Sequence, residues 1–104
     1  AARRAQRLSE AQQRALIERS PLAIGTMPDG TSVLEPNAAF LHLLGRPDLG
    51  STRIPVASFV HAEDLAACRV QIEAVRRGER ASARGNWRYL RADGSCHWVQ
   101  SAIT

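Results

Sequence analysis

The residues of this chain that could carry chemistry are three histidines, two cysteines and one pair of adjacent carboxylates. The histidines His42, His61 and His97 are too scattered to form the ligand set of a metal site. No serine, cysteine or carboxylate stands at a motif spacing from a base, and no glycine-rich phosphate loop is present. The sequence therefore predicts a domain that is not an enzyme and that binds no metal.

The cysteines and the carboxylates have ordinary structural explanations. Cys68 and Cys96 match no metal-binding spacing, so we expect free thiols, buried or half-buried, in a reducing compartment. Glu63 and Asp64 begin a predicted helix, where the helix dipole stabilises negative charge. Neighbouring residues on a helix point in different directions, so this pair is not expected to work as an acid and a base.

The composition indicates a single soluble domain. The chain has 104 residues, of which 44% are hydrophobic and 23% are charged, and no apolar run is long enough to span a bilayer. Its net charge of +4 comes with fourteen arginines and no lysine. The arginines are dispersed along the chain, so neither nucleic acid nor a membrane is an expected partner. We expect a cytoplasmic location.

A β-hairpin over residues 86–99 is the strongest local signal. Two runs rich in aromatic, arginine and β-branched residues flank Asp93-Gly94, and Asp-Gly is typical of a tight turn between strands. Strand alternation places Trp87 and Tyr89 on one face of the first strand. In the second strand it places Trp98 with Cys96 and Gln100.

The chain before the hairpin is predicted to fold as short strands and helices. Residues 22–27 and 31–34 form a second strand-turn-strand unit around Asp29-Gly30. A short helix follows Asn37, a good N-cap, and residues 46–58 are predicted to be a loop with at most one helical turn. The longest interior helix covers residues 62–77, and its inward stripe is Leu65, Cys68, Ile72 and Val75. This order indicates an α+β fold.

Residues 1–19 contain no glycine or proline and predict one continuous helix, which we interpret as a linker or capping helix. Leu8, Ala11 and Ala15 lie at heptad spacing, so this amphipathic helix could pack on the sheet, pair with a second copy or continue a coiled coil from an upstream domain. All three alternatives stay open at this point.

The order of these motifs resembles the PAS family. A-L-I-E-R-S-P-L-A-I-G-T-M-P-D-G (15–30) is similar to the family's N-terminal helix and first strand, and E-P-N-A-A-F-L-H-L-L-G (35–45) to its first core helix. F-V-H-A-E-D-L (59–65) resembles the start of the family's long helix, and R-Y-L-R-A-D-G-S-C-H-W-V (88–99) its penultimate hairpin. The resemblance covers residues 15–104.

The resemblance implies a PAS domain over residues 20–104. The family has a five-stranded antiparallel sheet flanked by short helices and one longer helix, whereas only four strands can be recognised in this sequence. The missing strand normally lies in the centre of the sheet, so the resemblance implies either that the sequence stops before the family's last strand or that an unrecognised segment completes the sheet. An open sheet edge at that place would be prone to pairing.

The resemblance also implies a function. PAS domains sense small molecules, light, redox state or partners, so we expect a sensory domain of a bacterial signalling protein. Its output domain would be a diguanylate cyclase, a histidine kinase or a phosphatase. The alternative is a ligand-free PAS module that acts in homodimerisation and relays a signal.

The resemblance argues against two cofactors. Light-sensing relatives bind flavin covalently through a cysteine in the helical connection, but residues 54–61 contain none. Haem-binding relatives mostly place a histidine on or just before the long helix; here His61 stands only at its start, where domains without haem commonly have one. We therefore expect neither haem nor covalent flavin. A small apolar ligand would lie among nine candidate residues: Phe40, Leu44, Phe59, Leu65, Cys68, Ile72, Trp87, Tyr89 and Trp98.

Overall fold

The computed structural model describes residues 9–49 and 53–104. Its regular elements are α1 (Glu10–Arg19), β1 (Ser32–Val33), α2 (Ala38–Leu43), β2 (Ile54–Pro55), the 3₁₀ turn η1 (Val56–Ser58), α3 (Ala62–Arg76), β3 (Ala83–Leu90) and β4 (Cys96–Ile103). The mixture of helices with antiparallel strands confirms the α+β fold class.

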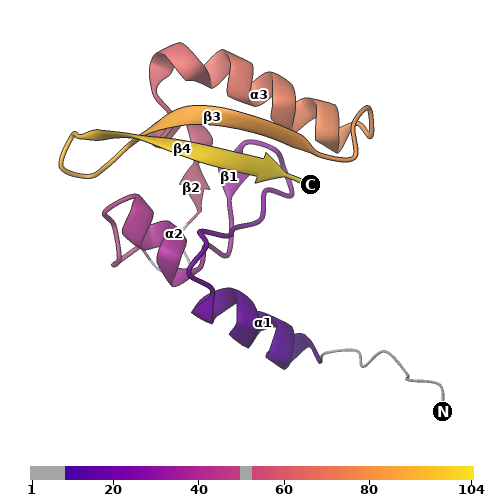
Figure 1. The fold of residues 1–104 in the computed structure, drawn as a ribbon, viewed down its shortest axis with the longest axis vertical. Coiled ribbons are helices and arrows are strands. Elements are labelled where there is room, and N and C mark those ends of the chain that lie inside the picture. The colour runs from indigo at the N-terminus through magenta and orange to yellow at the C-terminus, as the bar shows by residue number, and fades with distance from the viewer. Residues whose placement is uncertain (1–8, 50–52) are drawn as a thin grey trace.

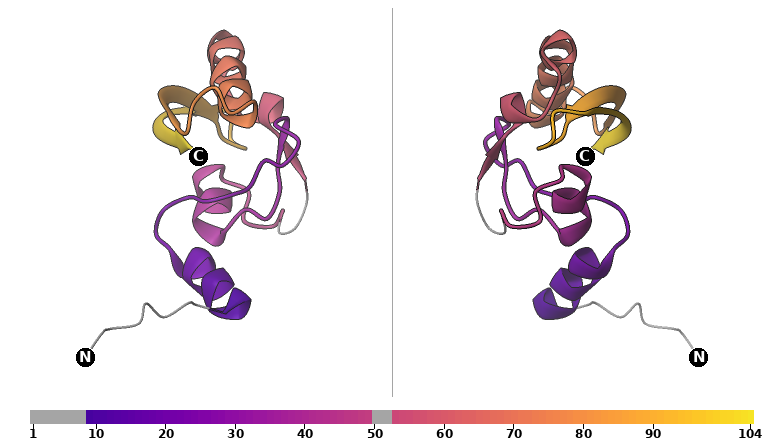
Figure 2. Two further views of the ribbon diagram at one scale, coloured as in Figure 1. Left: turned by 90° about the vertical axis from the view of Figure 1, so that its right-hand side faces the viewer. Right: turned by 90° about the vertical axis from the view of Figure 1, so that its left-hand side faces the viewer.

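The long hairpin and α3 form one side of the molecule, and α2 with the chain around it forms the other (Figure 1). In the views of Figure 2, α1 lies at the far end from α3. The buried side chains between these parts make one cluster, which includes Phe40, Leu44, Phe59, Ile72 and Trp87.

The hairpin is present as predicted. Strands β3 and β4 pair antiparallel over their whole length, from Leu90 opposite Cys96 to Ala83 opposite Ile103. The turn is closed by the Arg91 amide, which donates to the Ser95 carbonyl at 2.8 Å. Gly94 has a φ of 85°, the left-handed conformation that glycine adopts without strain.

Helix α3 also agrees with its prediction. It begins after His61, whose Nδ1 accepts a hydrogen bond from the Glu63 amide at 3.1 Å. Gly78, with a φ of 73°, follows its C-terminus. Cys68 and Ile72 are buried, while Leu65 and Val75 on the same predicted stripe are only half-buried.

The predicted strand-turn-strand unit over residues 22–34 is present only in part. An isolated bridge joins Thr26 to Leu34, and β1 pairs with β2, which lies in the segment predicted to be a loop. The Asp29 carboxylate accepts hydrogen bonds from the amides of Thr31 and Ser32 at 2.9 and 3.0 Å, so these amides close the turn. Pairing between the two predicted strands is limited to Thr26 and Leu34.

The four strands form two separate sheets rather than one. β1 pairs with β2, and β3 pairs with β4. Residues 59–61 run along the outer edge of β3, where the Leu90 amide donates to the Phe59 carbonyl and the His61 amide to the Arg88 carbonyl. The edge of β4 that faces away from β3 has no strand partner among the described residues.

The N-terminal helix is shorter than predicted. Ser9 is the N-cap of α1, with an extended backbone at ψ 162°, so one helix does not continue through this position. Leu8, a predicted dimerisation residue, lies outside the described residues. Ala11 and Ala15 are on α1 and exposed, as are Leu16 and Ile17, and α1 buries none of its residues.

Asn37 joins the N-terminal part of the chain to α2. Its carboxamide oxygen accepts hydrogen bonds from the amides of Ile24 and Phe40 at 2.9 and 3.0 Å. Its Nδ2 donates to the carbonyls of Ile17 and Leu22, both at 2.8 Å. Because Asn37 is only 1% exposed, water cannot replace these partners.

We predict that Asn37→Ala lowers the free energy of unfolding by about 3 kcal/mol, because it removes a helix cap and leaves buried backbone groups without partners. Chemical denaturation followed by circular dichroism measures this change. The matched control is Ser9→Ala, since Ser9 caps α1 on an exposed part of the surface and its loss should cost about 1 kcal/mol or less. Equal costs at the two caps would contradict the role assigned to Asn37.

Candidate ligand cavity

A cavity of about 580 Å³ lies between α2, α3, the hairpin and the chain segment 23–28. This volume is within the range of small-molecule sites. Six of the nine predicted ligand-pocket residues line it: Phe40, Phe59, Cys68, Ile72, Trp87 and Tyr89.

The other three predicted residues do not line the cavity. Leu44 is 1% exposed and is part of the core, and Leu65 packs on the edge of that core. Trp98 is 68% exposed, so its prediction as a pocket wall is wrong. The reason is strand alternation: Trp98 is opposite Arg88, one residue away from the Trp87–Val99 pair whose side chains point inward.

Several lining residues were missed at the sequence level. They come from residues 23–28 and from the second half of β4, including Met27, Val99 and Ile103. Strand alternation directs the side chains of Val99 and Trp98 to opposite faces of β4. This pattern could have identified Val99 as a residue that lines the cavity. Residues 23–28 reach the cavity because of the contacts that Asn37 makes, and their sequence has no local pattern that predicts this position.

Three aromatic rings form one wall of the cavity. The centre of the Phe59 ring lies 4.9 Å from the centre of the Tyr89 ring and 5.7 Å from that of the Phe40 ring. Both pairs are close to an edge-to-face arrangement. Burial raises the pKa of Tyr89 to about 12, so its hydroxyl stays protonated near neutral pH. No hydrogen bond from this hydroxyl is found to the described residues, which leaves it available as a donor to a ligand.

Cys68 contributes a neutral thiol to the same cavity. Burial, with a smaller effect of Asp64, raises the pKa of this thiol above its usual value. The thiolate is the reactive form of cysteine, so Cys68 is a poor nucleophile in this environment. Cys96 is exposed rather than half-buried, and both cysteines are free.

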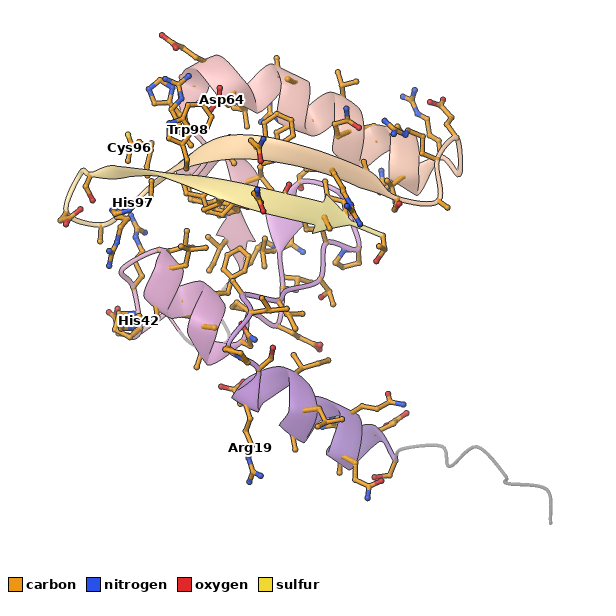
Figure 3. All side chains as sticks on the ribbon, in the orientation of Figure 1. Arg19, His42, Asp64, Cys96, His97 and Trp98 are labelled. Atoms are coloured by element: carbon orange, nitrogen blue, oxygen red, sulfur yellow. The ribbon has the colours of Figure 1, made fainter. Side chains whose placement is uncertain are left out.

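Arg88 connects the hairpin to the start of α3 by hydrogen bonds. Its guanidinium binds the Asp64 carboxylate through Nε and Nη2, both at 3.0 Å, and Nη2 also reaches Glu63 at 2.9 Å. The Arg88 backbone amide donates to Asp64 at 2.8 Å. The guanidinium also lies over the exposed Trp98 ring, 5.2 Å from its centre, and Figure 3 shows Trp98 beside Asp64.

These bonds lower the pKa of Asp64 from its usual 3.8 to about 2, chiefly through the Arg88 side chain and then through its amide. Glu63 and Asp64 are therefore charges at the start of α3 that bind Arg88.

Asp93, Ser95 and His97 lie together at the tip of the hairpin, but their arrangement is that of a turn. The Ser95 hydroxyl donates to Asp93 at 2.6 Å and lies 3.3 Å from the His97 ring nitrogen. The Asp93 carboxylate is thus hydrogen-bonded to the serine and not to the histidine. In a catalytic triad the carboxylate is bound to the histidine instead. All three residues lie on the surface, where Asp93 also accepts the Ser95 amide and closes the turn.

The other histidines show no common site. His42 is exposed on α2, and His61 caps α3. Within residues 9–49 and 53–104, no group of three or more histidine, cysteine, aspartate or glutamate side chains is placed to hold a metal ion. The same part of the chain contains no helix that is long and apolar enough to cross a membrane.

Comparison with known proteins identifies the family. A family model described as the PAS fold matches residues 33–104, which is more than half of the chain, and the protein therefore belongs to the PAS family. No curated protein matches the chain. The match does not reach residues 15–32, so the resemblance there stays a prediction.

We predict that Asp64→Asn destabilises the fold more than Glu63→Gln at pH 7, because the Asp64 side chain is only 16% exposed and accepts three hydrogen bonds from Arg88, whereas the Glu63 side chain is 73% exposed. Since the folded-state pKa of Asp64 is depressed, its contribution is full above about pH 4 and is lost as the pH falls towards 2. Urea denaturation at pH 7 and near pH 2 tests this. If the two variants differ in free energy of unfolding by the same amount at both pH values, the prediction is contradicted.

Proposed function

We propose that this chain is the sensory PAS domain of a bacterial signalling protein and that its cavity takes a small, mainly apolar molecule. The observation that carries the proposal is the 580 Å³ cavity with its aromatic and aliphatic lining. The Tyr89 hydroxyl supplies a neutral donor in this lining, so a ligand with one hydrogen-bond acceptor fits best.

The output of the signal belongs to an attached domain such as a diguanylate cyclase, a histidine kinase or a phosphatase. The domain itself works by binding rather than by catalysis, in line with the neutral Cys68 thiol and the structural roles of Glu63 and Asp64. Two free cysteines support a cytoplasmic location.

We predict that Val75→Phe removes ligand binding. Val75 lines the cavity and is only half-buried, so a larger ring fills space that a ligand needs without overpacking the centre of the core. Native mass spectrometry of the purified chain should show a mass excess that denaturation removes, and Val75→Phe should lack it.

The matched control is Val70→Phe, the same change on the same helix at a position that is 68% exposed. This variant should keep the mass excess. A parent chain whose native and denatured masses agree would contradict ligand binding, as would a mass excess that survives Val75→Phe.

A second candidate function is homodimerisation through α1. The observation that favours it is that α1 buries no residue of its own domain, while Leu16 and Ile17 are 60% and 42% exposed. Figure 1 shows α1 extending away from the sheet and from α3. A helix with this much exposed apolar surface gains stability by packing on a partner helix.

We predict that Ala15→Arg weakens self-association at least tenfold, because it places a large charge on the proposed seam of Ala11 and Ala15. Ala15→Leu is the control, since leucine keeps the helix propensity and should maintain or strengthen a dimer. Sedimentation velocity measures both. An unchanged dimer in Ala15→Arg would exclude α1 as the interface.

A further inference from the structure

One wall of the cavity is a stripe of side chains along α3. Cys68, Ile72, Val75 and Arg76 line the cavity from successive turns of this helix. Because an α-helix rises about 1.5 Å per residue, the stripe is about 12 Å long from Cys68 to Arg76. Figure 1 shows α3 running along β3, so the stripe follows the length of the hairpin. A ligand that covers this wall is therefore elongated.

The end of the stripe near Cys68 is apolar and aromatic. Tyr89 forms an isolated bridge with Val60, just before the N-terminus of α3, and its ring packs against the ring of Phe59. Phe59 is only 4% exposed, and every lining side chain at this end is uncharged. This end suits the apolar part of a ligand.

The other end of the stripe carries a positive charge. Among the described residues, Arg76 is the only charged residue that lines the cavity, and no aspartate or glutamate side chain does. The Arg76 side chain is 43% exposed, so it lies at the mouth of the cavity and not among the buried rings. An anion bound at the mouth keeps part of its contact with water, which lowers the cost of its desolvation.

Two contacts hold the Arg76 side chain in this position. Its Nη1 donates a hydrogen bond to Oε1 of Glu73 at 3.1 Å. Its Cδ lies across Gly30, where a Cβ atom would collide with it. Because the side chain is already held, it loses little further conformational freedom when it binds an anion.

Glu73 neutralises Arg76 only in part. Its carboxylate also lies 3.8 Å from Nε of Arg77, so one negative charge is shared by two guanidinium groups. Nε and Nη2 of Arg76, which lie on one edge of its guanidinium, have no hydrogen-bond partner among the described residues. Two parallel N–H groups of this kind match the two oxygens of a carboxylate.

We propose that the ligand of this cavity is an elongated monocarboxylic acid, with its carboxylate on Arg76 and its apolar chain along α3 towards Phe59 and Tyr89. This inference rests on the function proposed above, because it names the class of the small, mainly apolar ligand. The open edge of the guanidinium recognises the acid group, and the apolar stripe accommodates the chain. An oxygen at the far end of the chain would accept the hydrogen bond that the Tyr89 hydroxyl can donate.

The probes are decanoate and decanol, which share a carbon chain and differ in the charged group. Isothermal titration calorimetry with the 104-residue chain should show decanoate bound on the order of fivefold tighter than decanol, the effect of a charge-assisted hydrogen bond at a partly exposed site. Arg76→Gln should remove this preference. The same variant should bind decanol with unchanged affinity, which shows that it is folded and that its cavity is intact.

The matched control is Arg77→Gln, the same change one residue later on a side chain that is 67% exposed and does not line the cavity. It should keep the preference for decanoate. Repulsion by Glu73 is separated from the loss of Arg76 by a double variant. When Arg76→Gln is made together with Glu73→Gln, the preference should still disappear, although Glu73 can no longer repel the probe.

Equal affinity for the two probes, or a preference that survives Arg76→Gln, would overturn the proposal and leave a neutral apolar ligand in its place. Binding of either probe to Val75→Phe would also overturn it, because the probe would then lie outside the cavity. If neither probe binds while the native mass still shows an excess that denaturation removes, the acid is excluded and the proposed function stands. The mass excess tests that function separately, so the two failures are distinguishable.

Discussion

The buried carboxamide of Asn37 is the contact on which the arrangement of the cavity depends. It holds the end of α1, residues 22–24 and the start of α2 together by four side-chain hydrogen bonds. These backbone groups are not part of any sheet, so no ladder would keep them in place without it. One side of the cavity is therefore positioned by a single polar side chain rather than by regular secondary structure.

The other side of the cavity is positioned by Arg88 and Asp64. Their hydrogen bonds fix α3 along the hairpin, and the bonds of residues 59–61 add a second attachment at the edge of β3. The two sides of the cavity thus have separate anchors, and no strand ladder joins them among the described residues. The cavity lies between these two anchored parts and is lined mainly by apolar side chains.

Local sequence signals predicted the parts of the fold that local chemistry controls. The Asp-Gly turn of the hairpin, the N-cap of α2 and the alternation of the hairpin were all readable, as was the inward position of Cys68 and Ile72 on α3. Pairing between distant segments was not readable. The partner of β1 lies in residues 54–55, about twenty positions away, where no strand pattern exists. Trp98 lies on the outer face because it alternates with Val99, so aromatic character alone does not predict burial on this strand.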